Sequence, residues 1–261
     1  MSQPKYTYET YPFPSPTLLS SPPPNFSLLV HKYASVRLEA LLTSPSAFGS
    51  THEIENAFTT AEWERRVWRE GFVVLVCVAK PVCDSGVVEL NTITSNNLGH
   101  LEGDWVGIAT LLGPISKASY GLPPESGGPE IGSDEEETRW HMTGLYTSPE
   151  HRRKGLAKMI INSAMAYARN RTLHSSSPSG KQQNVRLRIM IRPDNIDVVS
   201  LYAALGFVDA GRCTGVEAFK ANGDETLIER RMNSPGMRPE MMVVRIGLVM
   251  ERLESLVVEA I

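Results

Sequence analysis

The sequence has few of the features that assign a chain to a specialised class of protein. Its 261 residues include only three cysteines, Cys77, Cys83 and Cys213. Because three is an odd number and their spacing does not suit a metal, we expect reduced thiols rather than a disulfide framework. The longest apolar run, residues 72–79, is far shorter than the roughly 18–20 residues of a membrane helix. This run therefore predicts a buried strand.

An excess of charge of one sign is also missing. The chain has 26 Lys and Arg against 29 Asp and Glu, a formal net charge of −3. Such a balance provides no general field that would attract nucleic acid, so we expect the function to lie in a local site. The N-terminal residues show neither a secretory signal nor an Arg-rich transit peptide. We therefore expect a cytoplasmic monomer or homodimer that binds neither nucleic acid nor membrane.

Four segments look peripheral to the folded core. Residues 1–25 contain seven prolines, a composition that predicts a disordered tail. Residues 117–138 are rich in acidic residues, Gly and Pro, and residues 172–184 are rich in Ser, Gly and Gln, so both predict inserted loops. The apolar residues of segment 249–261 suit an additional C-terminal helix.

Strand and helix patterns alternate along the rest of the chain, which predicts an α/β fold. A strand at 139–147, the strongest helix at about 152–170 and a strand at 185–191 follow one another. This order implies a parallel strand pair joined by a right-handed crossover. The remaining expected strands lie at 72–79, 105–112, 207–214 and 241–248, and the remaining helices near 33–42, from 60 and at 196–205.

The strongest predicted helix opens with three cations, Arg152, Arg153 and Lys154. The unpaired N–H groups and the dipole at a helix start favour anions, so cations are unfavourable there. A phosphate-bearing ligand would reverse this, and the small residues Gly155 and Ala157 would let it approach the backbone. A solvated basic turn explains the segment equally well by itself.

The stretch from Leu145 to Ala157 resembles the acyl-CoA-binding signature of the GCN5-related N-acetyltransferase (GNAT) superfamily. That signature reads Arg/Gln-x-x-Gly-x-Gly/Ala after a strand, and Arg152, Gly155 and Ala157 occupy its fixed positions. The similarity extends to Ser44–Ser50 and Trp63, and it covers roughly residues 26–248.

A second GNAT signature, an Asn followed by Tyr and then Gly-Phe, is similar to Asn195, Tyr202 and Gly206-Phe207. The chain departs from the usual pattern at Val198 and in the two inserted loops. The resemblance implies one domain over 26–248 with a three-layer α/β/α fold. Its mixed, twisted sheet would contain a parallel strand pair that splays apart.

The resemblance also implies how acetyl-CoA would bind. The pantetheine arm would pair with the strand end at Leu145 to Thr147, and an N–H near Leu145 would stabilise the oxyanion. The pyrophosphate would rest on the N–H groups of 153–158, with Arg152 and Arg153 supplying charge. The cofactor-binding residues implied in this way are Leu145, Tyr146, Thr147, Arg152, Arg153, Lys154, Gly155, Leu156, Ala157, Lys158 and Asn195. Asn195 could equally be a helix N-cap.

Acetyl transfer to an amine needs a proton acceptor and a proton donor. Tyr202 lies at the usual acid position of the family, although an isolated Tyr could also simply pack at a helix end. His141 lies eleven residues before Arg152, where the histone acetyltransferases of the superfamily carry a Glu, and an imidazole can accept a proton near neutral pH. A strand histidine that faces solvent or packs on Trp140 is the alternative. Glu53 and Glu55 are further candidates for the base.

The resemblance therefore implies an enzyme that moves an acetyl group from acetyl-CoA to a primary amine by direct attack in a ternary complex. No His, Cys and Asp cluster has metal-ligand spacing, so no metal is implied. Two alternatives remain open, a non-catalytic acyl-CoA-binding regulatory module and transfer of a different acyl group. The acceptor can be a small amine, an amino acid, a drug or a protein N-terminus.

Overall fold

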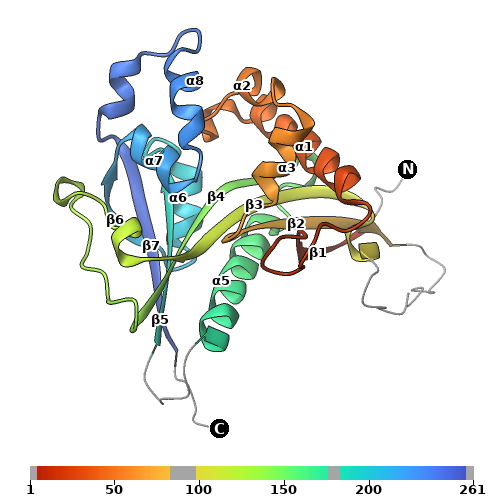
Figure 1. Cartoon of the computed structure of the whole chain (residues 1–261), viewed down its shortest axis with the longest axis horizontal. Helices are drawn as coiled ribbons and strands as arrows, with labels where there is room; N and C mark the ends of the chain where they lie inside the picture. Colours follow the sequence, from red (N-terminus) through yellow and green to blue (C-terminus); the bar gives the residue numbers. More distant parts are fainter. Residues whose placement is uncertain (1–4, 83–97, 176–182, 257–261) are drawn as a thin grey trace.

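The computed structural model describes residues 5–82, 98–175 and 183–256. Within these ranges one seven-stranded sheet has the order β1-β2-β3-β4-β5-β7-β6 (Figure 1). Neighbouring strands are antiparallel except β4 and β5, which are parallel. The strands are β1 (Tyr6–Pro12), β2 (Phe72–Pro81), β3 (Asp104–Ile115), β4 (Glu137–Thr147), β5 (Gln183–Ile191), β6 (Val208–Cys213) and β7 (Gly247–Leu256).

Helices cover both faces of this sheet (Figure 1). One face carries α1 (Phe26–Thr43), α2 (His52–Asn56) and α3 (Thr60–Val67). The other face carries α5 (Leu156–Ser175) and α6 (Ile196–Ala203). Three short helices complete the described part, α4 (Lys117–Tyr120), α7 (Gly215–Ala221) and α8 (Ile228–Met232). None of the described helices is long and apolar enough to cross a membrane.

Strand β2 shows why the central layer is buried on both sides. Its alternate residues Val73 and Leu75 join the core beneath α5, whereas Val74 and Val76 join the core beneath α1 and α3. Successive side chains of a strand point to opposite faces, so a continuous apolar run suits a strand between two helical layers. The expected three-layer α/β/α fold is confirmed.

The parallel pair β4 and β5 diverges along its length. Pairing in the described structure covers Glu137–His141 with Asn184–Arg188 and stops there, although both strands continue. Beyond His141, the register of β4 against β3 shifts and Gly144 adopts a φ of +67°, which is the geometry of a bulge that bends the strand. The expected splay is confirmed, and it leaves the end of β4 without a strand neighbour on its β5 side.

The prediction that residues 1–25 form a disordered tail is wrong. Residues 6–12 form strand β1, which pairs antiparallel with β2 at the sheet edge. The next residue, Phe13, is fully buried and its ring lies 5.9 Å from that of Phe26. An edge strand tolerates a proline such as Pro12 because one of its sides needs no hydrogen-bond donor.

The predicted C-terminal helix over 249–261 is also wrong. Strand β7 (Gly247–Leu256) occupies most of this segment and lies between β5 and β6. Residues 257–261 lie outside the described ranges. The apolar residues of such a short segment fit the periodicity of a helix and that of a strand equally well. Here the strand forms because β5 and β6 lie on either side and supply its hydrogen-bond partners. The strand expected at 241–248 begins only at Gly247, after a 3-10 turn at Pro239–Val243.

The inserted segments are more structured than the sequence indicated. Segment 117–138 contains α4 and buries Tyr120 and Ser126 against the sheet. Of segment 172–184, α5 extends to Ser175 and β5 starts at Gln183, and the rest lies outside the described ranges. The helices between β6 and β7, at 214–246, were not anticipated, and they pack on Ile54 of α2. Cys77 and Cys213 are buried free thiols, whereas Cys83 is not among the described residues.

Candidate active site

The signature cations lie in the loop between β4 and α5. Helix α5 begins at Leu156, so the expectation that Arg152, Arg153 and Lys154 fill its first turn is wrong. The loop is instead shaped by two left-handed residues, Arg153 at φ +62° and Gly155 at φ +80°. Left-handed residues among right-handed ones turn successive N–H groups toward one concave side, which favours an anion.

This loop presents unused hydrogen-bond donors. The structure records no hydrogen bond from the backbone N–H groups of residues 153–158 to any described residue. A Cβ placed on Gly155 would meet no atom within 4 Å, so the space beside the loop is open. Six unpaired donors beside an open space fit a phosphate group.

The side chain of Arg152 ties the loop to its surroundings. Its Nε donates to the carbonyl of Thr147 at 3.1 Å and its Nη2 donates to Ser44 Oγ at 3.0 Å. Arg152 therefore positions the loop and has less capacity left for a ligand than expected. Arg153 and Lys158 are exposed and form no ion pair within the described residues, so these two cations remain available.

Strand β1 supports the loop from the other side. The Lys154 ammonium lies 5.8 Å from the ring centroids of both Tyr6 and Tyr8, a cation–π arrangement. The Tyr8 hydroxyl bonds His151 Nδ1 at 3.0 Å, and partial burial together with the nearby Lys154 charge lowers the pKa of His151. The sequence analysis missed these tyrosines because it assigned their segment to a tail, although their alternate spacing was a strand signal.

Beyond His141, the backbone groups of β4 that face β5 have no strand partner in the described structure. The Tyr146 carbonyl lies 3.0 Å from the Cβ position of Gly107 in β3, so it points toward that strand. Because backbone groups alternate along a strand, those of Leu145 and Thr147 point to the diverged side. The Tyr146 side chain is buried toward α1 and donates to Glu39 at 2.8 Å, and burial raises its pKa to about 12.

The second signature lies on helix α6. Tyr202 is buried, its ring lies 5.2 Å from that of Phe207, and burial raises its pKa above the ordinary value. Its hydroxyl forms no hydrogen bond with the described residues and stays protonated at neutral pH, as an acid requires. Asn195 occupies the N-cap position of α6 but its side chain makes no capping bond, so the N-cap explanation is wrong.

The structure contradicts the expectation that His141 is the general base. The side chain is fully buried, its Nε2 bonds Asn222 Oδ1 at 2.8 Å, and its Nδ1 accepts from Arg188 Nε at 3.4 Å. Burial, together with the charge of Arg188, lowers the pKa of His141 to about 3. A neutral imidazole with both nitrogens engaged has no lone pair free for an amine proton.

The two alternative bases are also poorly suited. Glu55 is fully buried and forms ion pairs with Arg37 at 2.7 Å and Arg66 at 3.8 Å. Burial acts to raise its pKa, but these two guanidinium groups outweigh burial and lower the pKa to about 2. Hydrogen bonds from its own backbone N–H and from Thr51 lower the pKa of exposed Glu53. Such weakly basic carboxylates take up a proton poorly at neutral pH.

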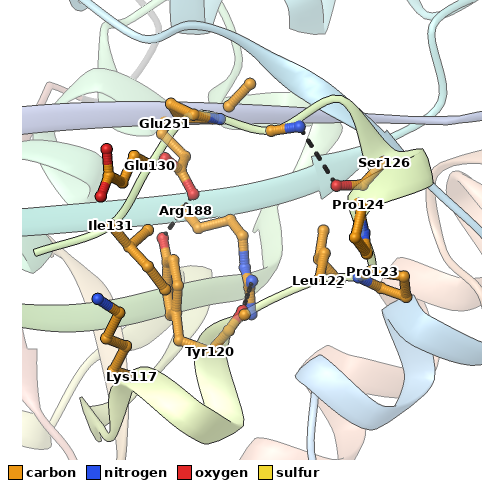
Figure 2. A pocket seen from close by; sticks show the side chains of 14 residues that line it. Lys117, Tyr120, Leu122, Pro123, Pro124, Ser126, Glu130, Ile131, Arg188 and Glu251 are labelled. Carbon is orange, nitrogen blue, oxygen red and sulfur yellow. Dashed lines mark hydrogen bonds between the residues drawn. The ribbon is translucent and has the colours of Figure 1, made fainter.

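A cavity of about 800 Å³ lies on the α1 face of the sheet, between the end of β3, the α4 turn and α7. Arg188 of β5 lines it and also lines an adjacent cavity of about 240 Å³, shown in Figure 2. The larger volume is within the usual range of small-molecule sites. The sequence analysis identified 185–191 only as a strand and assigned no role to Arg188. No described group of three or more His, Cys, Asp or Glu is placed to hold a metal ion.

Known proteins are similar to this chain in sequence over one segment and in fold over most of its length. Residues 100–207 match the model of the acetyltransferase (GNAT) family. Among solved structures, Arabidopsis thaliana NAA60 in complex with acetyl-CoA is 13% identical with a TM-score of 0.51, covering 95% of this chain and 98% of that chain. The ribosomal-protein-S18-alanine N-acetyltransferase from Escherichia coli is 10% identical with a TM-score of 0.45, covering 98% and 99%. No curated protein matches the sequence.

Proposed function

We propose that the chain transfers an acetyl group from acetyl-CoA to a primary amine, because residues 100–207 match the model of the acetyltransferase (GNAT) family, whose cosubstrate is acetyl-CoA. The observation that carries this proposal is the β4–α5 loop. Its six unpaired N–H groups at 153–158 and the open space at Gly155 suit a pyrophosphate. The cations of Arg153 and Lys158 would add charge-assisted contacts.

The strands that diverge beyond His141 would accommodate the rest of the cosubstrate. Backbone groups of Leu145 and Thr147 would pair with the pantetheine arm, and the free side chain of Asn195 would lie alongside it. An N–H near Leu145 would stabilise the oxyanion that forms as the amine attacks. Lys154, held by the tyrosines of β1, would keep the loop in place.

The proposed chemistry is direct transfer in a ternary complex. Acetyl-CoA supplies the acetyl group as a thioester, so a C–N bond forms at the amine while a C–S bond breaks. Tyr202 would donate its phenolic proton to the departing thiolate. The amine would attack in its neutral form, and its nitrogen would then lose one proton to solvent, since His141 has no free nitrogen. Solvent would return one proton to the Tyr202 phenolate, which restores the acid.

Release of free CoA thiol from acetyl-CoA in the presence of a panel of amines tests this function. We expect Gly155→Glu to abolish acetyl-CoA binding by calorimetry, because a carboxylate at this position would repel the pyrophosphate. Gly236→Glu is the matched control, since Gly236 also has a left-handed φ of +75° and open space around it. That control separates the effect of charge at the loop from the backbone strain that both substitutions introduce.

Three results would change the assignment. Undiminished acetyl-CoA affinity in Gly155→Glu would remove the basis for the cosubstrate site. Binding of acetyl-CoA without thiol release by any amine would favour the alternative function, a non-catalytic acyl-CoA-binding module. Faster thiol release from a longer acyl-CoA would instead identify a different acyl group.

A further inference from the structure

The cavity of about 800 Å³ contains a buried cation that has no carboxylate partner. Arg188 is only 2% exposed. Its Nη1 donates to the Tyr120 carbonyl at 2.6 Å and its Nε donates to His141 at 3.4 Å. Nη2 makes no hydrogen bond with a described residue, although Arg188 lines both cavities. Figure 2 shows the guanidinium beside the Tyr120 ring, and the two groups are 3.9 Å apart.

The neighbouring arginine on the same strand face is arranged differently. Arg186 is also buried, but it forms ion pairs with Glu137 and Glu251, both at 2.8 Å. Glu251 is the carboxylate whose charge acts on Arg188, yet its two oxygens already accept from Arg186 and the Tyr120 hydroxyl. Because an unpaired buried charge is unfavourable, stability alone does not explain Arg188. An anion that enters the cavity would supply the missing partner.

The position of Arg188 relates this cavity to the proposed reaction. Arg188 pairs with His141 in the last rung that joins β4 and β5. Leu112, which is opposite His141 on β3, also lines the cavity. The proposed acetyl position lies beyond this rung, where the strands diverge. A strand advances about 3.3 Å per residue, so Leu145, near which the acetyl carbonyl is proposed to lie, is about 13 Å along β4 from this rung. The Arg188 side chain and a ligand bound to it would have to span this distance together.

The cavity walls restrict the chemistry of the ligand. A guanidinium binds a carboxylate through two parallel N–H donors, and Phe72 and Leu122 supply apolar surface. Glu70, Glu225 and Lys220 are exposed lining residues. Because the two carboxylates outnumber the one ammonium, these exposed residues disfavour a doubly charged phosphate and favour a ligand that also carries a cationic amine.

We propose that the acceptor is an amino-acid-like molecule whose carboxylate is bound by Arg188 and whose amine is acetylated at the fork between β4 and β5. This inference rests on the proposed acetyl transfer and specifies its substrate class. A carboxylate contact of this kind changes affinity by about tenfold to a hundredfold.

Calorimetry with matched ligand pairs tests the carboxylate contact directly. The pairs are phenylalanine with phenethylamine, leucine with isoamylamine, and lysine with cadaverine, which differ only in the carboxylate. We expect the wild type to bind at least one carboxylated member about tenfold to a hundredfold more tightly than its partner. Arg188→Met should abolish this preference and Arg188→Lys should retain part of it. Arg212→Met, which removes an exposed arginine of β6 that pairs with Asp209, should keep it.

Urea unfolding of each variant shows whether a loss of binding reflects loss of the fold. The proposal is overturned if no carboxylated ligand binds, if both members of each pair bind equally, or if folded Arg188→Met keeps the preference. Carboxylate-dependent binding without release of CoA thiol would leave the anion site standing and refute the proposed acetyl transfer. Equal acetylation of amines with and without a carboxylate would support the proposed acetyl transfer and refute the anion site.

Discussion

Replacing Arg186 and Arg188 by methionine, one at a time, should change stability by very different amounts. Both arginines are buried on the same face of β5, but only Arg186 has acidic partners, Glu137 and Glu251. Arg186→Met would leave two buried carboxylates without this shared cation. Breaking a buried ion pair typically destabilises a protein by about 3–5 kcal/mol.

Arg188→Met should have a small effect on the free energy of unfolding. Burial lowers the pKa of Arg188, which means that the folded state disfavours its charge. The substitution removes the hydrogen bond to the Tyr120 carbonyl, but it also removes the desolvation penalty of the guanidinium. Because these effects oppose each other, we expect a net change of less than about 1.5 kcal/mol in either direction.

Urea unfolding followed by tryptophan fluorescence measures both changes under one set of conditions. A loss of about 3 kcal/mol or more in Arg188→Met, the value typical of a broken buried ion pair, would show that Arg188 has a structural partner. A loss below about 1 kcal/mol in Arg186→Met would show that the ion pairs contribute little. A bound carboxylate ligand should stabilise the wild type and not Arg188→Met.

Three further outcomes follow from the site. The folded-state pKa of His141, about 3, is below its unfolded value, so the free energy of unfolding should be highest above about pH 6.5 and fall by about 2 kcal/mol between pH 7 and 5. In His141→Gln this loss should shrink. Identical pH profiles of the free energy of unfolding in both proteins would contradict a buried, neutral His141. Tyr202→Phe should lower kcat by about 10²–10⁴-fold and leave acetyl-CoA affinity nearly intact; a wild-type rate would exclude Tyr202 as the acid. Arg153→Ala should weaken acetyl-CoA binding by about tenfold, and an unchanged calorimetric Kd would show that this exposed cation does not contact the cosubstrate.

The sequence alone determined the elements whose signal is local. The apolar run of β2 and the β4–α5–β5 order are periodic patterns that depend on neighbouring residues. Gly155 could be identified as a special position because a residue without a side chain lets an anion approach the backbone, and its left-handed φ of +80° is found only in the structure. These features were sufficient to locate the parallel strand pair, its crossover helix and the cationic segment before that helix, whereas the three-layer fold was expected from the resemblance to GNAT enzymes.

The edge strand β1 and strand β7 could not be recognised in this way. The seven prolines of residues 1–25 suggested disorder, and segment 249–261 had apolar residues that suit a helix as well as a strand. Short segments of this kind take the structure for which hydrogen-bond partners are present, and those partners are distant in the sequence. Only the assembled sheet shows that β2 pairs with β1 and that β5 and β6 enclose β7.

The chemistry of the buried polar residues was decided by the tertiary structure. A histidine at position 141 suggests a base until Arg188 and Asn222, which are 47 and 81 residues away in the chain, occupy both of its nitrogens. In the same way, Arg188 differs from Arg186 only through the side chains that surround each of them. A charge state depends on burial and on neighbouring charges, and folding brings these together from distant parts of the chain.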